Sequence, residues 1–253
     1  MQRIAAAAAA LAFAGAVHAQ EPVEICVEGA YPPFSEMDNE GEVVGFDIDI
    51  ANALCDEIGV ECDLVPTEWD AIIPALEEDK CDAIVASMSI TEERRQRIDF
   101  SEKYYQSPQH FVAAEGADWE DTNEGLAGKR VCVQRGTIHQ DYLEGEFPDV
   151  ELVLYPTQDE VYLDLASGRC DAIMGDTVAM QQGFLNTEAG EGYAILGDAH
   201  VVPEYHGDGA GIGVRKSDAE LRDRFSQAIQ AIRESGEYEE IQSKYFDFDI
   251  YGE

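Results

Sequence analysis

The tetrapeptide Cys81-Asp82-Ala83-Ile84 recurs along the chain as Cys170-Asp171-Ala172-Ile173. When the two copies are superposed, the upstream residues that coincide are Asp70 with Asp159, Ile72 with Val161, Leu76 with Leu165 and Lys80 with Arg169. Each copy predicts a helix, a short turn and a buried parallel strand. A chance match of common residues is the alternative, and the gap-free spacing disfavours it. We therefore expect one structural unit twice, in two similar α/β lobes.

The repeat also pairs two polar residues that follow the predicted strands. Ser87 superposes on Asp176, and both come just after a strand's carboxyl end, where open α/β sheets bind ligands. If the lobes face each other, a ligand between them meets a hydroxyl from one side and a carboxylate from the other. The alternative for Asp176 is an ordinary N-cap of the helix that follows it.

Arg94 adds a cation to this set. It lies near the start of a short predicted helix capped by Thr91, and helix starts favour anions. An arginine can bind a carboxylate through two hydrogen bonds. Arg94 for a carboxylate and Asp176 for an ammonium together describe an α-amino acid. A surface ion pair with a neighbouring glutamate is the alternative for Arg94.

Other local patterns predict how the chain is organised. Asp70 is expected to be the N-cap of the first repeat helix, and Ser217-Asp218-Ala219-Glu220 predicts a capping box before the last long helix. Two segments, 109–114 and 200–205, predict crossings between the lobes. The expected division is a signal peptide at 1–19, lobe 1 at 20–106 and 208–253, lobe 2 at 109–200, and hinges near 106–109 and 201–207.

The composition is strongly acidic. The 253 residues carry a formal net charge of −37, which makes nucleic-acid binding very unfavourable. The acidic residues are spread along a chain that also has ordered apolar patterning, so they predict a solvated surface and not a binding tail. We interpret this surface as an adaptation to high salt, where the self-repulsion of carboxylates is screened over about 3 Å at 1 M.

The amino-terminal residues predict export. Arg3 provides a positive start, an alanine-rich apolar stretch follows, and Val17-His18-Ala19 forms a small-x-small cleavage site. The apolar stretch is shorter than the roughly 20 residues that span a bilayer. We expect cleavage after Ala19 and a soluble periplasmic protein. No cysteine follows the stretch directly, which argues against a lipid anchor.

Six cysteines would remain after export to an oxidising compartment. Cys55 ends a helical pattern and Cys62 begins a strand after the Gly59 turn, so this pair is expected to form a disulfide. For the other four, in predicted buried strands, pairing and apolar packing both stay open; they are Cys26, Cys81, Cys132 and Cys170. The spacing does not predict a metal site.

Four further motifs stand out: Gly45-Phe46-Asp47-Ile48-Asp49-Ile50, Ser87-Met88-Ser89-Ile90-Thr91-Glu92-Glu93-Arg94, Gly207-Asp208-Gly209 and Lys244-Tyr245-Phe246-Asp247-Phe248. Together they resemble the periplasmic amino-acid-binding proteins of ABC importers, bacterial extracellular solute-binding protein family 3. Within this family the resemblance is to the lysine/arginine/ornithine- and histidine-binding group. The resemblance covers essentially the whole mature chain. It implies an α/β, two-lobed periplasmic-binding fold (type II), with a mainly parallel sheet in each lobe and two hinge strands.

The resemblance also implies roles at the ligand. Arg94 would bind the α-carboxylate with backbone help from Ser89 and the turn at Thr137, while Asp176 and Ser87 would bind the α-ammonium.

Further contacts are implied around the ligand side chain. Tyr31 and Trp69 match aromatic positions that sandwich it, and Glu28 matches an acid that meets a distal positive charge. Met88 and Ile138 are also expected at the ligand. Without the resemblance, Tyr31 and Trp69 would be read as core or rim aromatics.

Three positions depart from that group. This chain has Glu28 where the proteins of that group have aspartate, Ala86 where they have serine, and Ile138 where they have threonine. Two hydroxyls near the ligand are thereby lost and one acid is a methylene longer. We expect the groups that hold the carboxylate and the ammonium to survive these changes, so the resemblance implies the ligand class more directly than the ligand. Among the ligands, we rank arginine first, followed by lysine, ornithine and histidine.

The expected function is hinge closure on a free amino acid and delivery to the membrane permease of an ABC importer, by a monomer with no cofactor and no enzymatic activity. Rival hypotheses are a dehydratase of cyclic amino-acid precursors on the same fold, a sensor module, and a binding protein for another polar amino acid or a compatible solute such as ectoine.

Two patterns are set aside: the glycines at 207–213 lack a phosphate-loop context, and His200 and His206 are not expected to bind zinc.

Overall fold

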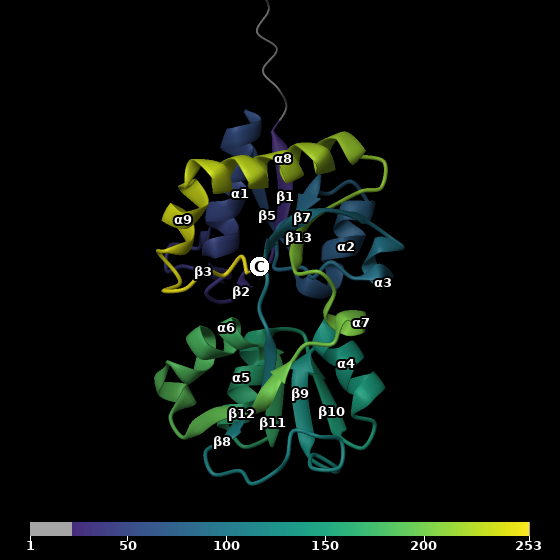
Figure 1. Cartoon of the computed structure of the whole chain (residues 1–253), viewed down its shortest axis with the longest axis vertical. Coiled ribbons are helices and arrows are strands. Elements are labelled where there is room, and N and C mark those ends of the chain that lie inside the picture. The colour runs from purple at the N-terminus through teal and green to yellow at the C-terminus, as the bar shows by residue number, and fades with distance from the viewer. Residues whose placement is uncertain (1–21, 253) are drawn as a thin grey trace, which may run out of the picture.

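The computed structural model describes residues 22–252, so the predicted signal peptide and its cleavage site lie outside the described residues. The chain forms two lobes stacked along the long axis (Figure 1). Each lobe is built on a five-stranded sheet that mixes parallel and antiparallel strands. The α/β two-lobed fold predicted from the repeat is therefore confirmed.

Lobe 1 contains both ends of the described chain. Its sheet has the order β5-β1-β6-β13-β7, and a small antiparallel sheet β2-β3-β4 lies beside it. The strands are β1 (Val23–Val27), β2 (Ala30–Tyr31), β3 (Ser35–Met37), β4 (Val43–Val44), β5 (Cys62–Pro66), β6 (Ala83–Ile84), β7 (Asp99–Tyr105) and β13 (Ala210–Val214). The helices are α1 (Phe46–Ile58), α2 (Trp69–Glu77), α3 (Glu92–Arg95), α8 (Ala219–Ser235) and α9 (Glu237–Gln242).

Lobe 2 has a sheet with the matching order β10-β9-β11-β8-β12. Its strands are β8 (Gln109–Ala114), β9 (Arg130–Gln134), β10 (Glu151–Tyr155), β11 (Ala172–Asp176) and β12 (Tyr193–His200). Its helical segments are α4 (Ile138–Glu146), α5 (Gln158–Ala166), α6 (Thr177–Met180), the π-helical η1 (Gln181–Leu185) and the 3₁₀ segment η2 (Glu188–Gly190). In each lobe the fourth strand in the sheet order enters from the other lobe and the fifth strand leaves to it.

The two crossings between the lobes differ. The first joins β7 to β8 directly, whereas the second, from β12 to β13, contains the short helix α7 (Pro203–His206). The crossing expected over 200–205 falls within this second connection. It does not continue as a strand beyond His200, because Pro203 starts a helix and lacks the N–H that a strand ladder needs.

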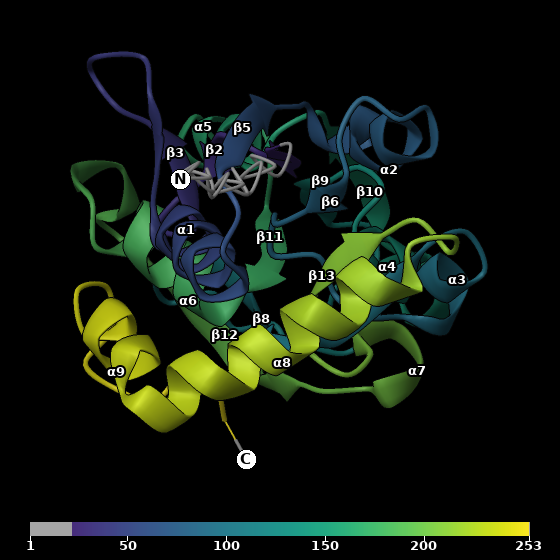
Figure 2. The ribbon, with the colours of Figure 1, turned by 90° about the horizontal axis from the view of Figure 1, so that it is seen from above.

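Helices cover both faces of each sheet, so each lobe has two cores. In β1, Ile25 faces the core shared with α1 and α8, while the next residue, Cys26, faces the core under α2. In β9, Val131 faces the α4 side and Cys132 the α5 side. Seen from above, α8 runs beside α1 toward α9 (Figure 2).

All six cysteines are bonded. Cys55 pairs with Cys62, as the sequence predicts, and the pairings that the sequence left open are Cys26 with Cys81 and Cys132 with Cys170. The last two occupy equivalent places, since each joins a lobe's central parallel strand to the residue that opens the repeated tetrapeptide.

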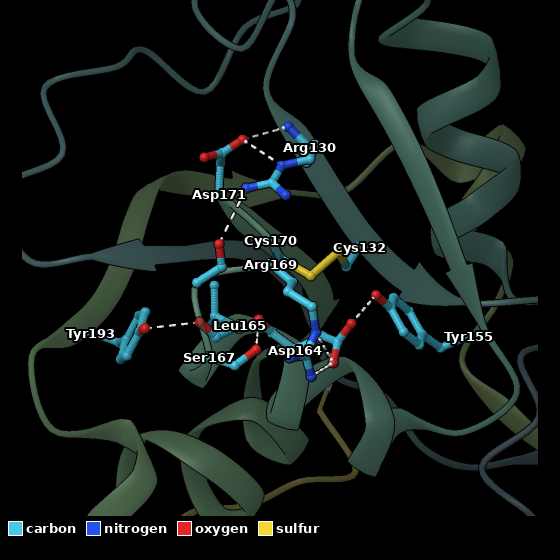
Figure 3. The surroundings of a disulfide bond; sticks show 11 residues. Arg130, Cys132, Tyr155, Asp164, Leu165, Ser167, Arg169, Cys170, Asp171 and Tyr193 are labelled. Carbon is cyan, nitrogen blue, oxygen red and sulfur yellow. Dashed lines mark hydrogen bonds and ion pairs between the residues drawn. A yellow bond between two sulfur atoms is a disulfide. The ribbon is translucent and has the colours of Figure 1, made fainter.

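The aspartate after each of these cysteines has a matching role. The Asp82 carboxylate accepts a hydrogen bond from the Glu24 N–H at 3.1 Å, and that of Asp171 accepts one from the Arg130 N–H at 2.8 Å. Figure 3 shows this arrangement around the Cys132–Cys170 bond. The duplication therefore extends from the sequence to a disulfide and an aspartate bond in each lobe.

One glycine fixes where α1 begins. Gly45 has φ 133°, and a Cβ there would lie 2.3 Å from the Phe34 carbonyl oxygen, which no side chain can tolerate. The close approach of these two segments lets α1 start directly against the turn between β2 and β3, where the Phe46 and Asp47 N–H groups donate to the Pro33 and Phe34 carbonyls. As a result Asp47, in the first turn, is fully buried below the space between the lobes.

Candidate functional site

A cavity lies between the lobes, at the facing carboxyl ends of their parallel strands. About 360 Å³ of space free of protein atoms lies within it, part of it open to solvent. Lobe 1 lines it with Glu28, Tyr31, Trp69, Ala86, Ser87, Ser89 and Arg94, and lobe 2 with Gln134, Thr137, Ile138, His139 and Asp176. The elements that carry these residues face each other in Figure 1.

The Asp176 carboxylate is available to the cavity. Asp176 occupies the N-cap position of α6, but its side chain makes no capping hydrogen bond. Its side chain is 13% exposed, and its negative charge contributes, after burial, to the raised pKa of the nearby Tyr31 and Tyr105 hydroxyls. An anionic acceptor at this depth suits a cation that enters the cavity.

Ser87 is held so that its oxygen accepts. Its hydroxyl donates to Asp47 Oδ2 at 2.9 Å, and its main-chain N–H donates to the Tyr104 hydroxyl at 2.9 Å. Tyr104 in turn donates to Asp47 Oδ1 at 2.8 Å. Because the Ser87 proton is committed to Asp47, the lone pairs of Ser87 Oγ remain for a donor in the cavity.

This arrangement costs local strain and a buried acid. Ser87 has a φ of 53°, a left-handed conformation that residues other than glycine rarely adopt. Burial raises the pKa of Asp47 to about 7, against the lowering effect of its bonds from Tyr104 and Ser87. Strained backbone and buried carboxyls cluster at functional sites.

Lobe 1 also carries a guanidinium at the cavity. Arg94 donates from Nη1 to the Ser89 carbonyl at 2.9 Å and from Nη2 to the Gly136 carbonyl at 3.4 Å, and its guanidinium carbon lies 5.3 Å from the Trp69 ring. Burial lowers the pKa of Arg94 to about 10, so the group stays charged at neutral pH. Within residues 22–252 no carboxylate forms an ion pair with Arg94, so the alternative of a surface ion pair with a neighbouring glutamate does not hold. The charge suits an incoming carboxylate.

The third part of the cavity is a buried acid. Glu28 is 5% exposed and accepts a hydrogen bond from Gln134 Nε2 at 2.7 Å. Burial, and then the charges of Asp47 and Asp159, raise the pKa of Glu28 to about 7, although the bond from Gln134 opposes this. A cation placed here would pair with Glu28 and favour its charged form.

Side chains at the rim join the two lobes. Arg135 Nε donates to Asp70 Oδ2 at 2.8 Å, Trp69 Nε1 donates to the Gly136 carbonyl at 3.0 Å, and Gln182 donates to the Tyr245 carbonyl at 2.9 Å on the other side. These contacts hold the lobes closed on each other.

Asp70 was expected to be the N-cap of α2. It lies instead inside the helix, whose N-cap is Glu68.

Nine of the ten side chains expected at a ligand line this cavity: Glu28, Tyr31, Trp69, Ser87, Ser89, Arg94, Thr137, Ile138 and Asp176. Met88 does not, since its side chain is 0% exposed in the core under α2. Sequence reasoning missed Gln134 and His139, which line the cavity, and Asp47 beneath it. Gln134 ends a predicted strand and His139 is next to Ile138, so both stood beside recognised signals.

The patterns set aside in the sequence have local partners. His200 Nδ1 is 2.9 Å from the Tyr142 hydroxyl, and His206 Nδ1 accepts from the Val202 N–H at 2.7 Å. Residues 22–252 contain no group of three histidine, cysteine or acidic side chains arranged to hold a metal ion. In the same range, no helix is both long and apolar enough to cross a bilayer.

The model of the bacterial extracellular solute-binding proteins, family 3, matches residues 23–248. The chain belongs to this family. It is 48% identical to the L-arginine-binding protein of Pseudomonas aeruginosa over 92% of this chain and 91% of that protein. It is 42% identical to the lysine/arginine/ornithine-binding periplasmic protein of Escherichia coli over 92% and 90% of the two chains.

A solved structure of this family has the same fold. The periplasmic binding protein of Salmonella typhimurium described for its high arginine specificity superposes with a TM-score of 0.82 at 33% identity, and the match covers 89% of this chain and 99% of that one. The resemblance inferred from the motifs is thereby confirmed as family membership.

Proposed function

We propose that this protein binds a cationic L-amino acid between its lobes, with arginine preferred over lysine, ornithine and histidine. The observation that carries the proposal is that one cavity between the lobes brings together an arginine without an ion-pair partner among residues 22–252, a carboxylate that makes no capping hydrogen bond and a buried glutamate. An amino acid with a charged side chain would satisfy all three. The names of the two family relatives, an L-arginine-binding and a lysine/arginine/ornithine-binding protein, support the same ligand class.

In this assignment each charged end of the ligand meets groups from both lobes. Arg94, with the main chain near Ser89 and Thr137, receives the α-carboxylate, while Asp176 and Ser87 receive the α-ammonium. Each charge-assisted hydrogen bond is worth about 1.5–3 kcal/mol.

The side chain would lie between Tyr31 and Trp69, and its terminal cation would face Glu28. The methylene that Glu28 adds relative to aspartate is compatible with the reach of a planar guanidinium, which can take two hydrogen bonds from one carboxylate.

We propose that the protein serves an ABC importer from the periplasm, after cleavage behind Ala19, as a monomeric binding component and not as an enzyme. Segments 106–109 and 201–207 would act as the hinges, and ligand binding would stabilise a closed form for the membrane permease. The family relatives, which are named as binding proteins, support this role.

Titration calorimetry of the protein from residue 20, in high salt, tests the ligand class. The panel contains the common amino acids, ornithine, citrulline and ectoine. We expect one-to-one binding that is tightest for arginine and much weaker for citrulline, which has the same shape without the charge. Tighter binding of ectoine, or turnover of prephenate or arogenate, would contradict the proposal.

A further inference from the structure

A histidine faces the carboxylate that we assign to the ligand ammonium. His139 lies in the first turn of α4 and lines the cavity. It is only 5% exposed, and its Nε2 lies 3.6 Å from Asp176 Oδ1. Among the described residues this nitrogen is buried and makes no hydrogen bond. A buried, unpartnered nitrogen at this distance from a ligand-facing carboxylate requires an explanation.

We propose that His139 is a positioning residue for Asp176, and that its protonation competes with the ligand's α-ammonium for that carboxylate. The proposal rests on the proposed function, because it assumes that an ammonium binds at Asp176. When neutral, the imidazole can donate one N–H to Asp176 and orient it. When protonated, it would itself be the cation that Asp176 pairs with.

Several other titratable groups surround the pair, and the test has to separate His139 from them. The hydroxyls of Tyr31 in β2, Tyr105 in β7 and Tyr162 in α5 are close to Asp176 and stay neutral at physiological pH. The carboxyl of Asp47 in α1, with a pKa raised by burial to about 7, is also coupled to Asp176, and it is the same in every protein compared below. The charged or titratable side chains facing His139 itself are Asp141 on α4, His206 on α7, and Arg94 and Glu28 across the cavity. Burial lowers the pKa of His206 to about 4, so His206 stays neutral above pH 5.

The sign of the effect follows from competition. Imidazoles change charge between pH 5 and 8. Below that change, Asp176 already has a cationic partner, and a bound ammonium must displace the proton from His139. Ligand affinity therefore falls as the pH falls, by up to about tenfold per pH unit at the steepest point. In contrast to the Glu28 effect, this loss applies to any α-amino acid.

The test separates His139 from Glu28 by using Glu28→Gln as the parent protein and arginine as the probe. Calorimetry at pH 7.5 and 5.5 should show a three- to tenfold loss of affinity in the parent. In Glu28→Gln/His139→Gln, where an amide can still donate to Asp176 but cannot titrate, that loss should shrink to less than twofold. The matched control is Glu28→Gln/His200→Gln, since His200 is a buried histidine of the same lobe that does not line the cavity.

The same loss of affinity in the parent and in the His139→Gln variant would overturn the inference. If that variant does not fold, NMR of the unaltered protein decides: the His139 ring should protonate at a lower pH with arginine bound than without it, and an unchanged titration would overturn the inference. Failure of the wild type to bind arginine at pH 7.5 would instead refute the proposed function.

Discussion

At the scale of single residues, the site depends on side chains whose hydrogen bonds to neighbouring protein groups fix whether they can donate or accept at the ligand. Ser87 gives its proton to Asp47, so the hydroxyl can only accept, and Arg94 donates to two carbonyls that cannot neutralise it. The cavity therefore presents fixed acceptors at one end and an uncompensated cation at the other. Such preorganised polar groups bind a zwitterion without paying for reorientation.

Arg94→Ala should remove the partner of the α-carboxylate. Because a charged hydrogen bond contributes about 1.5–3 kcal/mol and Arg94 can make two, we expect at least a hundredfold loss of affinity for every amino acid that binds. Calorimetry with arginine and lysine measures it. Arg169→Ala is the control, since Arg169 pairs with Asp164 on the surface of lobe 2, away from the cavity. A loss confined to one ligand would contradict the role.

Glu28→Gln should instead act on the ligand side chain. We expect a ten- to hundredfold loss for arginine and lysine and less than threefold for any neutral amino acid that binds, because only the distal charge loses its partner. Equal affinity of the variant and the wild type for arginine would show that Glu28 does not meet the cation.

The pH dependence of arginine binding follows from the same group. With a pKa of about 7 in the ligand-free closed form, Glu28 is increasingly protonated below pH 7, and a guanidinium favours its charged form. Arginine affinity should therefore rise from pH 5.5 to pH 8. Glu28→Gln should remove the pH dependence of arginine affinity that Glu28 causes. Any pH dependence that remains in this variant comes from other titratable groups, such as His139. Calorimetric profiles of the two proteins make the comparison, and parallel profiles would argue against the assignment.

At the scale of elements, the sequence predicts well what local patterns determine. The repeated helix, turn and strand, the N-cap Thr91 and the Cys55–Cys62 bond depend on near neighbours, whose spacing the sequence displays. The predicted capping box at Ser217 does not form: α8 begins at Ala219, and Asp218 pairs with Arg215 at 2.7 Å. A charged partner outside the helix outcompetes the local cap.

Distant partners explain what else the sequence missed or left open. Asp70 binds Arg135 of the other lobe, which becomes visible only once the lobes are placed in space. Cys26 pairs with Cys81 within lobe 1, which becomes visible only once the strand order is known. Of the residues around the cavity, Asp47 was hardest to foresee, because it acts through the hydroxyl of Ser87 and not on the ligand.

The pair Asp70–Arg135 should set how firmly the lobes stay closed. It joins α2 to the turn before α4, and both side chains are partly exposed, so its contribution is about 0.2–1 kcal/mol. Arg135→Ala should weaken arginine binding about two- to fivefold, mainly through faster dissociation. Stopped-flow kinetics measures this, again with Arg169→Ala as control. An unchanged dissociation rate would show that the Asp70–Arg135 pair does not hold the lobes closed.

At the scale of the whole molecule, charge repulsion opposes the compact fold. The net charge is −37, and many carboxylates lie on exposed surface. Salt at 1 M screens charges beyond about 3 Å, which relieves repulsion between carboxylates that no cation neutralises. The melting temperature should therefore rise steeply between low salt and 1–2 M salt in scanning calorimetry. A flat response would contradict the proposed adaptation to salt.

The central claim is that both lobes bind one cationic amino acid in a defined orientation. A crystal structure of the arginine complex tests it most directly. The account predicts the α-carboxylate on Arg94, the α-ammonium between Ser87 and Asp176, and the guanidinium between Tyr31 and Trp69 facing Glu28. An arginine bound in the reverse orientation, or outside this cavity, would contradict it.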